Sequence, residues 1–311
     1  MSVMRKVLLA MSTSPFLREQ ATRRTFVRKS VSAFMPGEKI EDALQAAGTL
    51  KPQGINTILT RLGEGVTKLD EAERVTEHYL DVLDKVKAAG LDAQISVKPT
   101  QLGLDLDAGQ CQKNLDRICE KAERLGNVPV WIDMENSPYV DPTLKLFRKS
   151  KERYKGVGIA IQAYLFRTSK DVEGLIPLGP AIRIVKGAYL ESAEVAYPKK
   201  SDVDESFYRL CCRLMAADAQ SSGTLLHIAT HDPTLIDRLS LFIDANKVPS
   251  SAYEFAMLYG IQRSQQLRLA REGRRIRVLI SYGEYWFPWY MRRLAERPAN
   301  VTFVLKNLVG G

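Results

Sequence analysis

The amino-acid sequence predicts an α/β protein folded as a (βα)8 barrel. Eight short apolar segments rich in β-branched residues recur along the chain, and longer stretches with helical periodicity separate them. These segments are residues 55–59, 95–98, 130–133, 158–163, 182–186, 225–230, 253–258 and 276–281. Strands that alternate with helices form parallel sheets, and eight such units close into a barrel. We therefore expect one barrel domain over residues 49–311.

Three of the intervening stretches carry clear helix signals. Residues 70–90 have one apolar stripe and end at Gly90, a residue type common at helix C-caps. The stripe consists of Val75, Tyr79, Val82, Leu83 and Val86. Residues 202–220 and 232–246 each open with an aspartate near the N-cap position, and Pro233 suits a first helical turn.

An open, doubly wound sheet is the alternative fold. It would normally carry a glycine-rich nucleotide-binding turn after its first strand. The segment 62–67, LGEGVT, lacks the third glycine and a helix start in register. The barrel therefore stays the prediction.

The N-terminal segment is strongly basic. Its first 36 residues contain seven Lys or Arg and a single acid, Glu19. We interpret residues 1–48 as a basic helical arm, with a transit peptide as the alternative. The apolar run VLLAM is too short for a secretory signal, and no run approaches the ~20 residues that cross a bilayer. A soluble or peripheral protein is expected.

Charge and cysteine content narrow the functional class. The net charge of +9 and the pI of about 9.3 indicate an anionic ligand or surface. Four cysteines without a CxxC motif predict buried thiols in a reducing compartment such as the cytoplasm, with neither a disulfide framework nor a zinc site. The histidines His78, His227 and His231 do not form a metal-binding pattern, so we expect no metal and an organic cofactor.

Polar residues end several of the predicted strands. In (βα)8 barrels the chemistry lies at the carboxyl ends of the strands, so these side chains should converge on one cavity. They are Lys98, Asp133, Gln162, Arg183, Lys186, Thr230 and His231. Any one alone is more often a solvated rim residue, and His231 alone would be a helix-entry residue. Together they leave a surplus of cations, which need anionic partners when they lose water.

Two adjacent arginines near the C-terminus add to this surplus. Arg292 and Arg293 are suited to bind a carboxylate, because guanidinium groups form forked hydrogen bonds with it. Glu296 lies one helical turn later and can hold either side chain. A basic helix face with surface ion pairs is the alternative for this spacing.

Seven motifs in order resemble the proline dehydrogenase family, flavin-dependent barrels that oxidise L-proline. The matching segments are SVKPTQLGLDL (96–106), IDMENS (132–137), IQAYLFRT (161–168), RIVKGAYLE (183–191), ATHD (229–232), EFAMLYG (254–260) and YGEYWFPWYMRRLAERPAN (282–300). The resemblance runs from about residue 35 to 308 and implies a distorted (βα)8 barrel whose last helix lies over the mouth. With the N-terminal helical arm, this barrel, of which residues 49–311 form the catalytic domain, makes up the whole chain.

The resemblance also implies a role for each site residue. Arg292, Arg293 and Lys98 would bind the substrate carboxylate, with Glu296 beside them, and Asp133 would preorganise these cations. Arg183 would lie near the flavin N5 and pyrophosphate. The other implied FAD-binding residues are Met134, Gln162, Lys186, Gly187, Ala188, Thr230 and His231. The residues implied to line the substrate ring are Tyr189, Leu258 and Leu279.

The implied reaction is hydride transfer from L-proline to FAD N5, giving 1-pyrroline-5-carboxylate, with the electrons passed to a quinone. The basic arm would then touch an anionic membrane, as a peripheral contact on the inner face of the cytoplasmic membrane. No nucleic acid is expected as a partner, because the cations follow apolar strands instead of alternating with exposed aromatics.

The sequence departs from the family pattern in the substrate wall. Leu279 and Ser281 replace the usual tyrosine and proline of the eighth strand, and Ala256 replaces a glutamine. These changes enlarge the pocket, so a bulkier or N-substituted cyclic amino acid is the alternative substrate. A flavin barrel of the methylenetetrahydrofolate reductase type and a non-catalytic anion-binding module are competing classes, and both explain the paired arginines less well.

Overall fold

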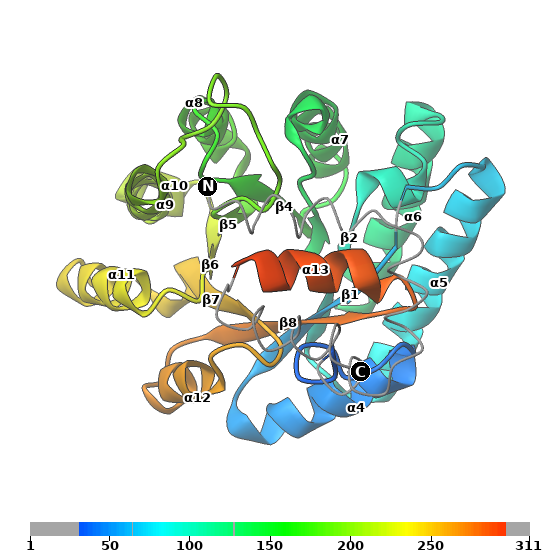
Figure 1. Cartoon of the computed structure of the whole chain (residues 1–311), viewed down its shortest axis with the longest axis horizontal. Helices are drawn as coiled ribbons and strands as arrows, with labels where there is room; N and C mark the ends of the chain where they lie inside the picture. Colours follow the sequence, from blue (N-terminus) through cyan, green and yellow to red (C-terminus); the bar gives the residue numbers. More distant parts are fainter. Residues whose placement is uncertain (1–30, 64, 127, 297–311) are drawn as a thin grey trace, which may run out of the picture.

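A computed structural model describes residues 31–63, 65–126 and 128–296, and a closed barrel lies at its centre. The strands of these residues are parallel and follow chain order around the barrel, and β1 pairs with β8 to close it (Figure 1). They are β1 (Asn56–Arg61), β2 (Ala93–Val97), β3 (Val130–Ile132), β4 (Val157–Gln162), β5 (Ala181–Val185), β6 (Leu225–Ala229), β7 (Tyr253–Leu258) and β8 (Ile276–Tyr282). The predicted (βα)8 barrel is confirmed.

Helices surround the strands and bury one face each against them. In the described ranges they are α5 (Leu69–Ala88), α6 (Ala108–Leu125), α7 (Val140–Lys151), α8 (Thr168–Glu173), α9 (Lys200–Leu214), α10 (Ala217–Ser221), α11 (Pro233–Ala245) and α12 (Arg263–Arg271). The predicted stripe of α5 is confirmed, since Tyr79, Val82, Leu83 and Val86 are fully buried and Val75 packs partly against the core. The core thus fills the layer between helices and strands.

Helix ends show one correct and one wrong prediction. Asp232 caps α11 by accepting the Thr234 amide at 3.2 Å, and Pro233 occupies the first turn. The single helix predicted over 202–220 is wrong: it begins earlier, after Lys199, and breaks into α9 and α10. The break falls at Ala216, whose extended backbone (φ −69°, ψ 156°) cannot continue a helix.

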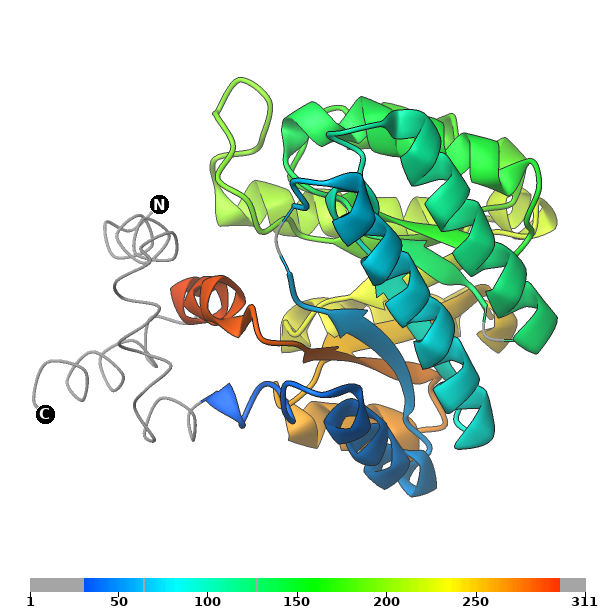
Figure 2. The same cartoon turned by 90° about the vertical axis from the view of Figure 1, so that its right-hand side faces the viewer.

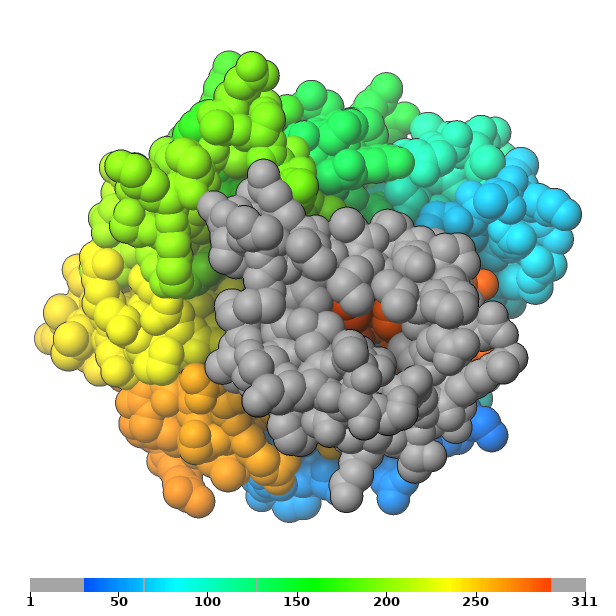
Figure 3. All heavy atoms as spheres, in the orientation of Figure 1, coloured from blue at the N-terminus to red at the C-terminus, as the bar shows by residue number. Residues whose placement is uncertain are grey.

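Two further helices lie at the ends of the described chain. α4 (Ile40–Leu50) packs against β8 and β1 and runs across the expected domain boundary at residue 48. α13 (Trp286–Glu296) crosses the barrel mouth beyond the ends of the strands (Figures 1 and 2). In the atom view of this face, α13 is visible near the centre and the outer helices form the rim (Figure 3). The expected basic arm falls largely on residues 1–30, outside the described part.

Three of the four cysteines are buried, as the sequence predicted. Cys111, Cys119 and Cys211 are buried free thiols, whereas Cys212 is half-buried. Burial raises the pKa of the Cys111 thiol to about 12, so it is inert near neutral pH. Within the described ranges, no helix is long and apolar enough to span a membrane.

Candidate functional site

A cavity of about 1030 Å³ opens at the carboxyl ends of the strands. Residues from β1 to β8 and from the loops that follow them line it. Among its lining residues are Lys98, Asp133, Met134, Gln162, Arg183, Lys186, Gly187, Ala188, Tyr189, Thr230, His231, Leu258 and Leu279. The predicted convergence of the polar strand ends on one cavity is therefore confirmed.

The barrel register explains which side chains face inward. Successive strand residues point to opposite faces, so every second residue enters the barrel. On β5 these include Arg183, which pairs with Ala160 of β4 on one side and with His227 of β6 on the other. Its partner on β4, Ala160, is small, and this leaves room for the long Arg183 side chain.

An ion cluster around Asp133 forms one wall of the cavity. The Arg183 Nη2 group lies 2.5 Å from Asp133 Oδ1, and Lys98 Nζ lies 3.5 Å from Oδ2. Ser96 Oγ donates to the same Oδ1 at 2.7 Å. Burial lowers the pKa of Arg183, and the Asp133 charge opposes this effect, so the guanidinium stays charged. Asp133, which follows β3, thus holds one cation that follows β2 and one that lies on β5.

Arg183 has hydrogen-bonding capacity to spare. Its side chain is almost fully buried, and Nη2 also donates to Ser96 Oγ at 2.8 Å. Its Nη1 group has no hydrogen-bond partner among the described residues. Gln162 is similar: Nε2 donates to the Glu135 carbonyl at 3.1 Å, while its buried Oε1 has no such partner. Because buried polar groups are nearly always satisfied, these two atoms point to a ligand or ordered water.

A second ion cluster surrounds Lys186. Its Nζ lies 2.5 Å from Asp204 Oδ1 and 3.0 Å from Asp232 Oδ2, and Lys200 contacts the same two carboxylates. Burial alone would raise the pKa of Asp232, but the hydrogen bonds and charges of Lys186 and Lys200 lower it. The sequence reading missed Asp204, which lies on α9 and not at a strand end.

The loop after β5 brings the backbone close to an aromatic ring. Gly187 has φ +114°, a conformation that favours glycine, and a Cβ at this position would lie 2.4 Å from Tyr164 Cδ1. Nearby, His231 Nε2 accepts the Leu258 amide at 2.8 Å, which leaves its ring proton on Nδ1. A side chain at position 187 would therefore have to move Tyr164. His231 does not only begin a helix, because it also lines the cavity and holds the backbone of Leu258.

The opposite wall of the cavity is mainly apolar. Leu279 and Ala256 line it, and Ser281 lies above Leu279 on β8. The Ser281 hydroxyl is buried and has no hydrogen-bond partner among the described residues. The sequence-based prediction missed five other residues that line the cavity: Ile58 and Thr60 on β1, Leu62 directly after β1, Phe34 in a turn and Trp289 on α13. The i, i+2, i+4 spacing on β1 was the available signal.

The predicted paired arginines and the question of a metal site remain to be placed. Arg292, Arg293 and Glu296 belong to α13, but their side chains lie outside the described part of the chain. Within the described ranges, no group of three or more His, Cys, Asp or Glu residues is arranged to hold a metal ion.

The fold and the cavity define the class of protein: a (βα)8-barrel enzyme with its site at the carboxyl ends of the strands. The proline dehydrogenase family model matches residues 43–306, and the chain belongs to that family of oxidoreductases. It is 35% identical over 308 residues to proline dehydrogenase 2 of Bacillus subtilis subsp. natto, covering 99% of both chains. It is 36% identical over 312 residues to proline dehydrogenase of Deinococcus radiodurans, covering 99% of this chain and 98% of that one.

Solved structures support the same fold. The proline utilization A protein of Bdellovibrio bacteriovorus, inactivated by N-propargylglycine, superimposes with a TM-score of 0.80 at 23% identity. The match covers 92% of this chain and 34% of that one, so this chain spans about a third of the larger protein.

Proposed function

We propose that the chain oxidises L-proline to 1-pyrroline-5-carboxylate with FAD as its cofactor. Two buried atoms carry this proposal, Arg183 Nη1 and Gln162 Oε1, which have no hydrogen-bond partner among the described residues. Both side chains line a cation-lined cavity in a member of the proline dehydrogenase family. A ligand with both hydrogen-bond acceptors and donors would satisfy them.

The residues on one side of the cavity fit a flavin dinucleotide. Gly187 and Tyr164 line this side in close contact, and Lys186 offers a cation for a pyrophosphate in exchange for its present carboxylate partners. The remaining residues proposed to hold FAD are Met134, Gln162, Arg183, Ala188, Thr230 and His231. When bound, FAD supplies an acceptor for a hydride at N5.

The opposite side would hold the amino acid. Lys98, Arg292 and Arg293 are proposed to bind its carboxylate, with Glu296 orienting the arginines. Tyr189, Leu258 and Leu279 are proposed to contact the ring. Asp133 acts by positioning Lys98 and Arg183, whose charges would otherwise repel each other.

The chemistry asked of these residues is mainly positioning. The substrate loses a hydride from the ring carbon next to nitrogen and a proton from nitrogen, which yields the imine product. A fixed carboxylate limits the ring to one orientation, and α13, which lies across the mouth, would restrict the access of water to it. The positive charge of Arg183 favours negative charge that develops on the acceptor.

The final electron acceptor is proposed to be a quinone, reached at an anionic membrane through the basic N-terminal segment. About 1 kcal/mol is expected for each Lys or Arg close to such a surface. The test is cosedimentation of the full chain with vesicles. Stronger binding to anionic than to neutral vesicles is expected, and equal binding would remove this part of the proposal.

The substrate proposal is tested by steady-state kinetics with purified, FAD-loaded protein and an artificial acceptor. L-proline should be oxidised, and a variant with both Arg292→Met and Arg293→Met should lose most of kcat/KM. A matched control is Arg274→Met, which removes an arginine that pairs with Asp244 away from the cavity. Full turnover by the double variant would contradict the proposal.

A bulkier or N-substituted proline-like amino acid is the second candidate substrate. Leu279, Ala256 and Ser281 all line the cavity, and the Ser281 hydroxyl has no partner among the described residues. A substituent with a polar atom would fill this wall and satisfy the hydroxyl. Rates with L-proline, hydroxyproline, pipecolate and N-alkyl prolines decide between the candidates, and a clear preference for L-proline removes the second.

A further inference from the structure

We infer that Trp131 positions the Arg183 guanidinium, and through it sets the properties of the bound flavin. The inference rests on the proposed function, in which Arg183 contacts FAD. Trp131 is fully buried on β3, beneath the cavity, and has no role in the site as described so far.

Among the described residues, hydrogen bonds hold the Arg183 side chain at Nη2. Nη2 contacts Asp133 and Ser96, but Nη1 has no hydrogen-bond partner among the described residues. A guanidinium fixed at one edge can rotate about that edge unless something supports its face. The Trp131 ring provides this support, since Arg183 Cζ lies 5.0 Å from the ring centroid. The electron-rich face of the indole attracts the guanidinium charge.

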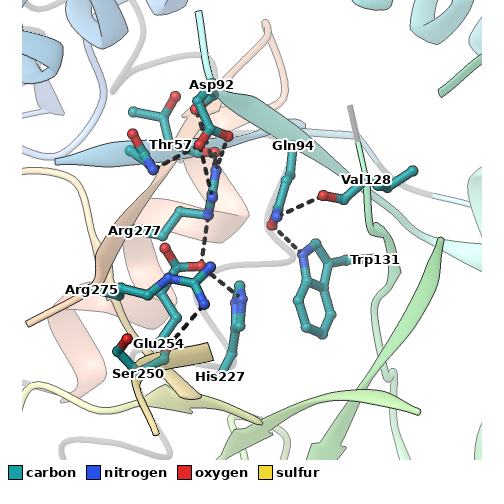
Figure 4. Close-up of polar contacts among 11 residues, drawn as sticks. Thr57, Asp92, Gln94, Val128, Trp131, His227, Ser250, Glu254, Arg275 and Arg277 are labelled. Carbon is teal, nitrogen blue, oxygen red and sulfur yellow. Dashed lines mark hydrogen bonds and ion pairs between the residues drawn. The ribbon is translucent and has the colours of Figure 1, made fainter. Parts of the chain in front are cut away.

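Trp131 is itself fixed from several directions. Its Nε1–H donates to Gln94 Oε1 at 2.8 Å, and Gln94 Nε2 donates to the Val128 carbonyl at 3.0 Å (Figure 4). Its ring also packs against the His227 imidazole, with centroids 4.2 Å apart. These two hydrogen bonds and the ring contact hold the indole in one orientation.

The neighbouring strand is adapted to the indole. Gly158 pairs with Trp131 in register, and a Cβ at Gly158 would lie 2.8 Å from the indole Cε3. Its φ is not in the left-handed region, so backbone conformation does not require glycine here. Space for the ring is the remaining reason, and it indicates that the position of Trp131 matters.

Below the indole, an ion network anchors His227. Its Nε2 lies 3.0 Å from Glu254 Oε2, and the same oxygen accepts from Arg277 Nε at 2.9 Å (Figure 4). Burial lowers the pKa of His227 to about 4, so the imidazole stays neutral near pH 7 and adds no charge beneath Arg183. Contacts thus run from Arg183 through Trp131 and His227 to Glu254 inside the barrel.

The test compares Trp131→Leu, which removes the ring, with Trp131→Phe, which keeps an aromatic face. Phe207→Leu is the control, because Phe207 is equally buried but lies on α9 outside the barrel interior. For each FAD-loaded protein we would measure the melting temperature, the flavin reduction potential, the rate of anaerobic flavin reduction by L-proline and the apparent Kd for L-proline.

We expect Trp131→Leu to slow flavin reduction about tenfold and to make the potential more negative, with the Kd for L-proline nearly unchanged. Trp131→Phe should show a smaller effect in the same direction, and Phe207→Leu should lower only the melting temperature. A Trp131→Leu protein whose rate and potential match those of Phe207→Leu would overturn the inference.

If Trp131→Leu does not fold, Gln94→Leu takes its place, because it removes the acceptor that fixes the indole. A wild-type rate and a wild-type potential in both Gln94→Leu and Trp131→Phe would then overturn the inference. If L-proline does not reduce the wild-type flavin, the proposed substrate fails. The potential, measured with dithionite and reference dyes, still tests Trp131.

Discussion

Two arginines inside the barrel have similar local sequences and different environments. Arg183 on β5 and Arg277 on β8 each enter the barrel between apolar neighbours, and both are nearly fully buried. Arg277 donates to Glu254, to the Thr57 carbonyl and to Asp92, so all three of its nitrogens have partners (Figure 4). Arg183 leaves Nη1 without one among the described residues.

This difference separates a stabilising network from a binding site. At the amino ends of the strands, charges are matched and every nitrogen of Arg277 is used within the protein. At the carboxyl ends, capacity for hydrogen bonding is left over and faces a cavity. A buried charge tolerates incomplete pairing only when another partner completes it. Glu254 Oε1 and the His227 ring nitrogens also lack hydrogen-bond partners among the described residues, but neither residue lines the cavity. Unused hydrogen-bonding capacity therefore marks a ligand site only where, as at Arg183, it lies at the cavity.

The largest effect is expected for Arg183→Met. It should lower the rate of flavin reduction by about 10²–10³-fold, because a fixed charge near the reacting atoms is lost. The free energy of unfolding should change little, because Asp133 keeps Ser96 and Lys98 as partners. Stopped-flow reduction and urea unfolding measure the two quantities. A large loss of stability with a normal rate would reverse the roles of the two arginines.

Arg277→Met should show the opposite pattern. Glu254 would remain buried without its main cationic partner, which costs about 3–5 kcal/mol of unfolding free energy. Burial would raise the pKa of Glu254, but hydrogen bonding to His227 and the Arg277 charge lower it to about 2. Urea unfolding tests the loss. Protein that does fold should reduce its flavin at nearly the wild-type rate, and a hundredfold slower rate would contradict the comparison.

The network of His227, Glu254 and Arg277 should also make the free energy of unfolding depend on pH. The folded pKa of His227 is about 4, below the value near 6.5 expected in the unfolded chain. As the pH falls from 6.5 to 4, only the unfolded state binds this proton, so stability decreases by about 3 kcal/mol. Unfolding of His227→Asn across this range should show a shallower slope. Some slope should remain, because burial also lowers the pKa of His78 to about 4.

An unchanged slope in His227→Asn would show that the imidazole does not stay neutral in the network.

The smallest effect concerns the apolar wall. Leu279→Tyr fills the cavity beside Ile58, its register partner on β1. If the enlarged wall admits bulky substrates, this change should shift the ratio of kcat/KM for pipecolate over L-proline downward by a few-fold to about tenfold, the range for one misfitting group in a pocket. Steady-state rates with both substrates measure it. An unchanged ratio would show that Leu279 does not contact the substrate.

The fold and much of the site were predictable from the sequence. β-Branched segments at regular spacing identified the strands, and polar residues at their ends identified Lys98, Asp133 and Arg183 as one group. The partners of Arg277 were not predictable, because Asp92 and Glu254 are brought to it only by barrel closure. Trp131 looked like an ordinary core residue, because only the three-dimensional structure brings it to Arg183. The break at Ala216 had no signal in composition.

The most direct test of the account is anaerobic titration of the FAD-loaded wild-type protein with L-proline, followed by flavin absorbance, with dithionite as the reference for full reduction. The account predicts that L-proline bleaches the flavin to the dithionite end point and that Arg183→Met bleaches far more slowly. A flavin that dithionite reduces but that stays oxidised with L-proline and every other cyclic amino acid tested would contradict it.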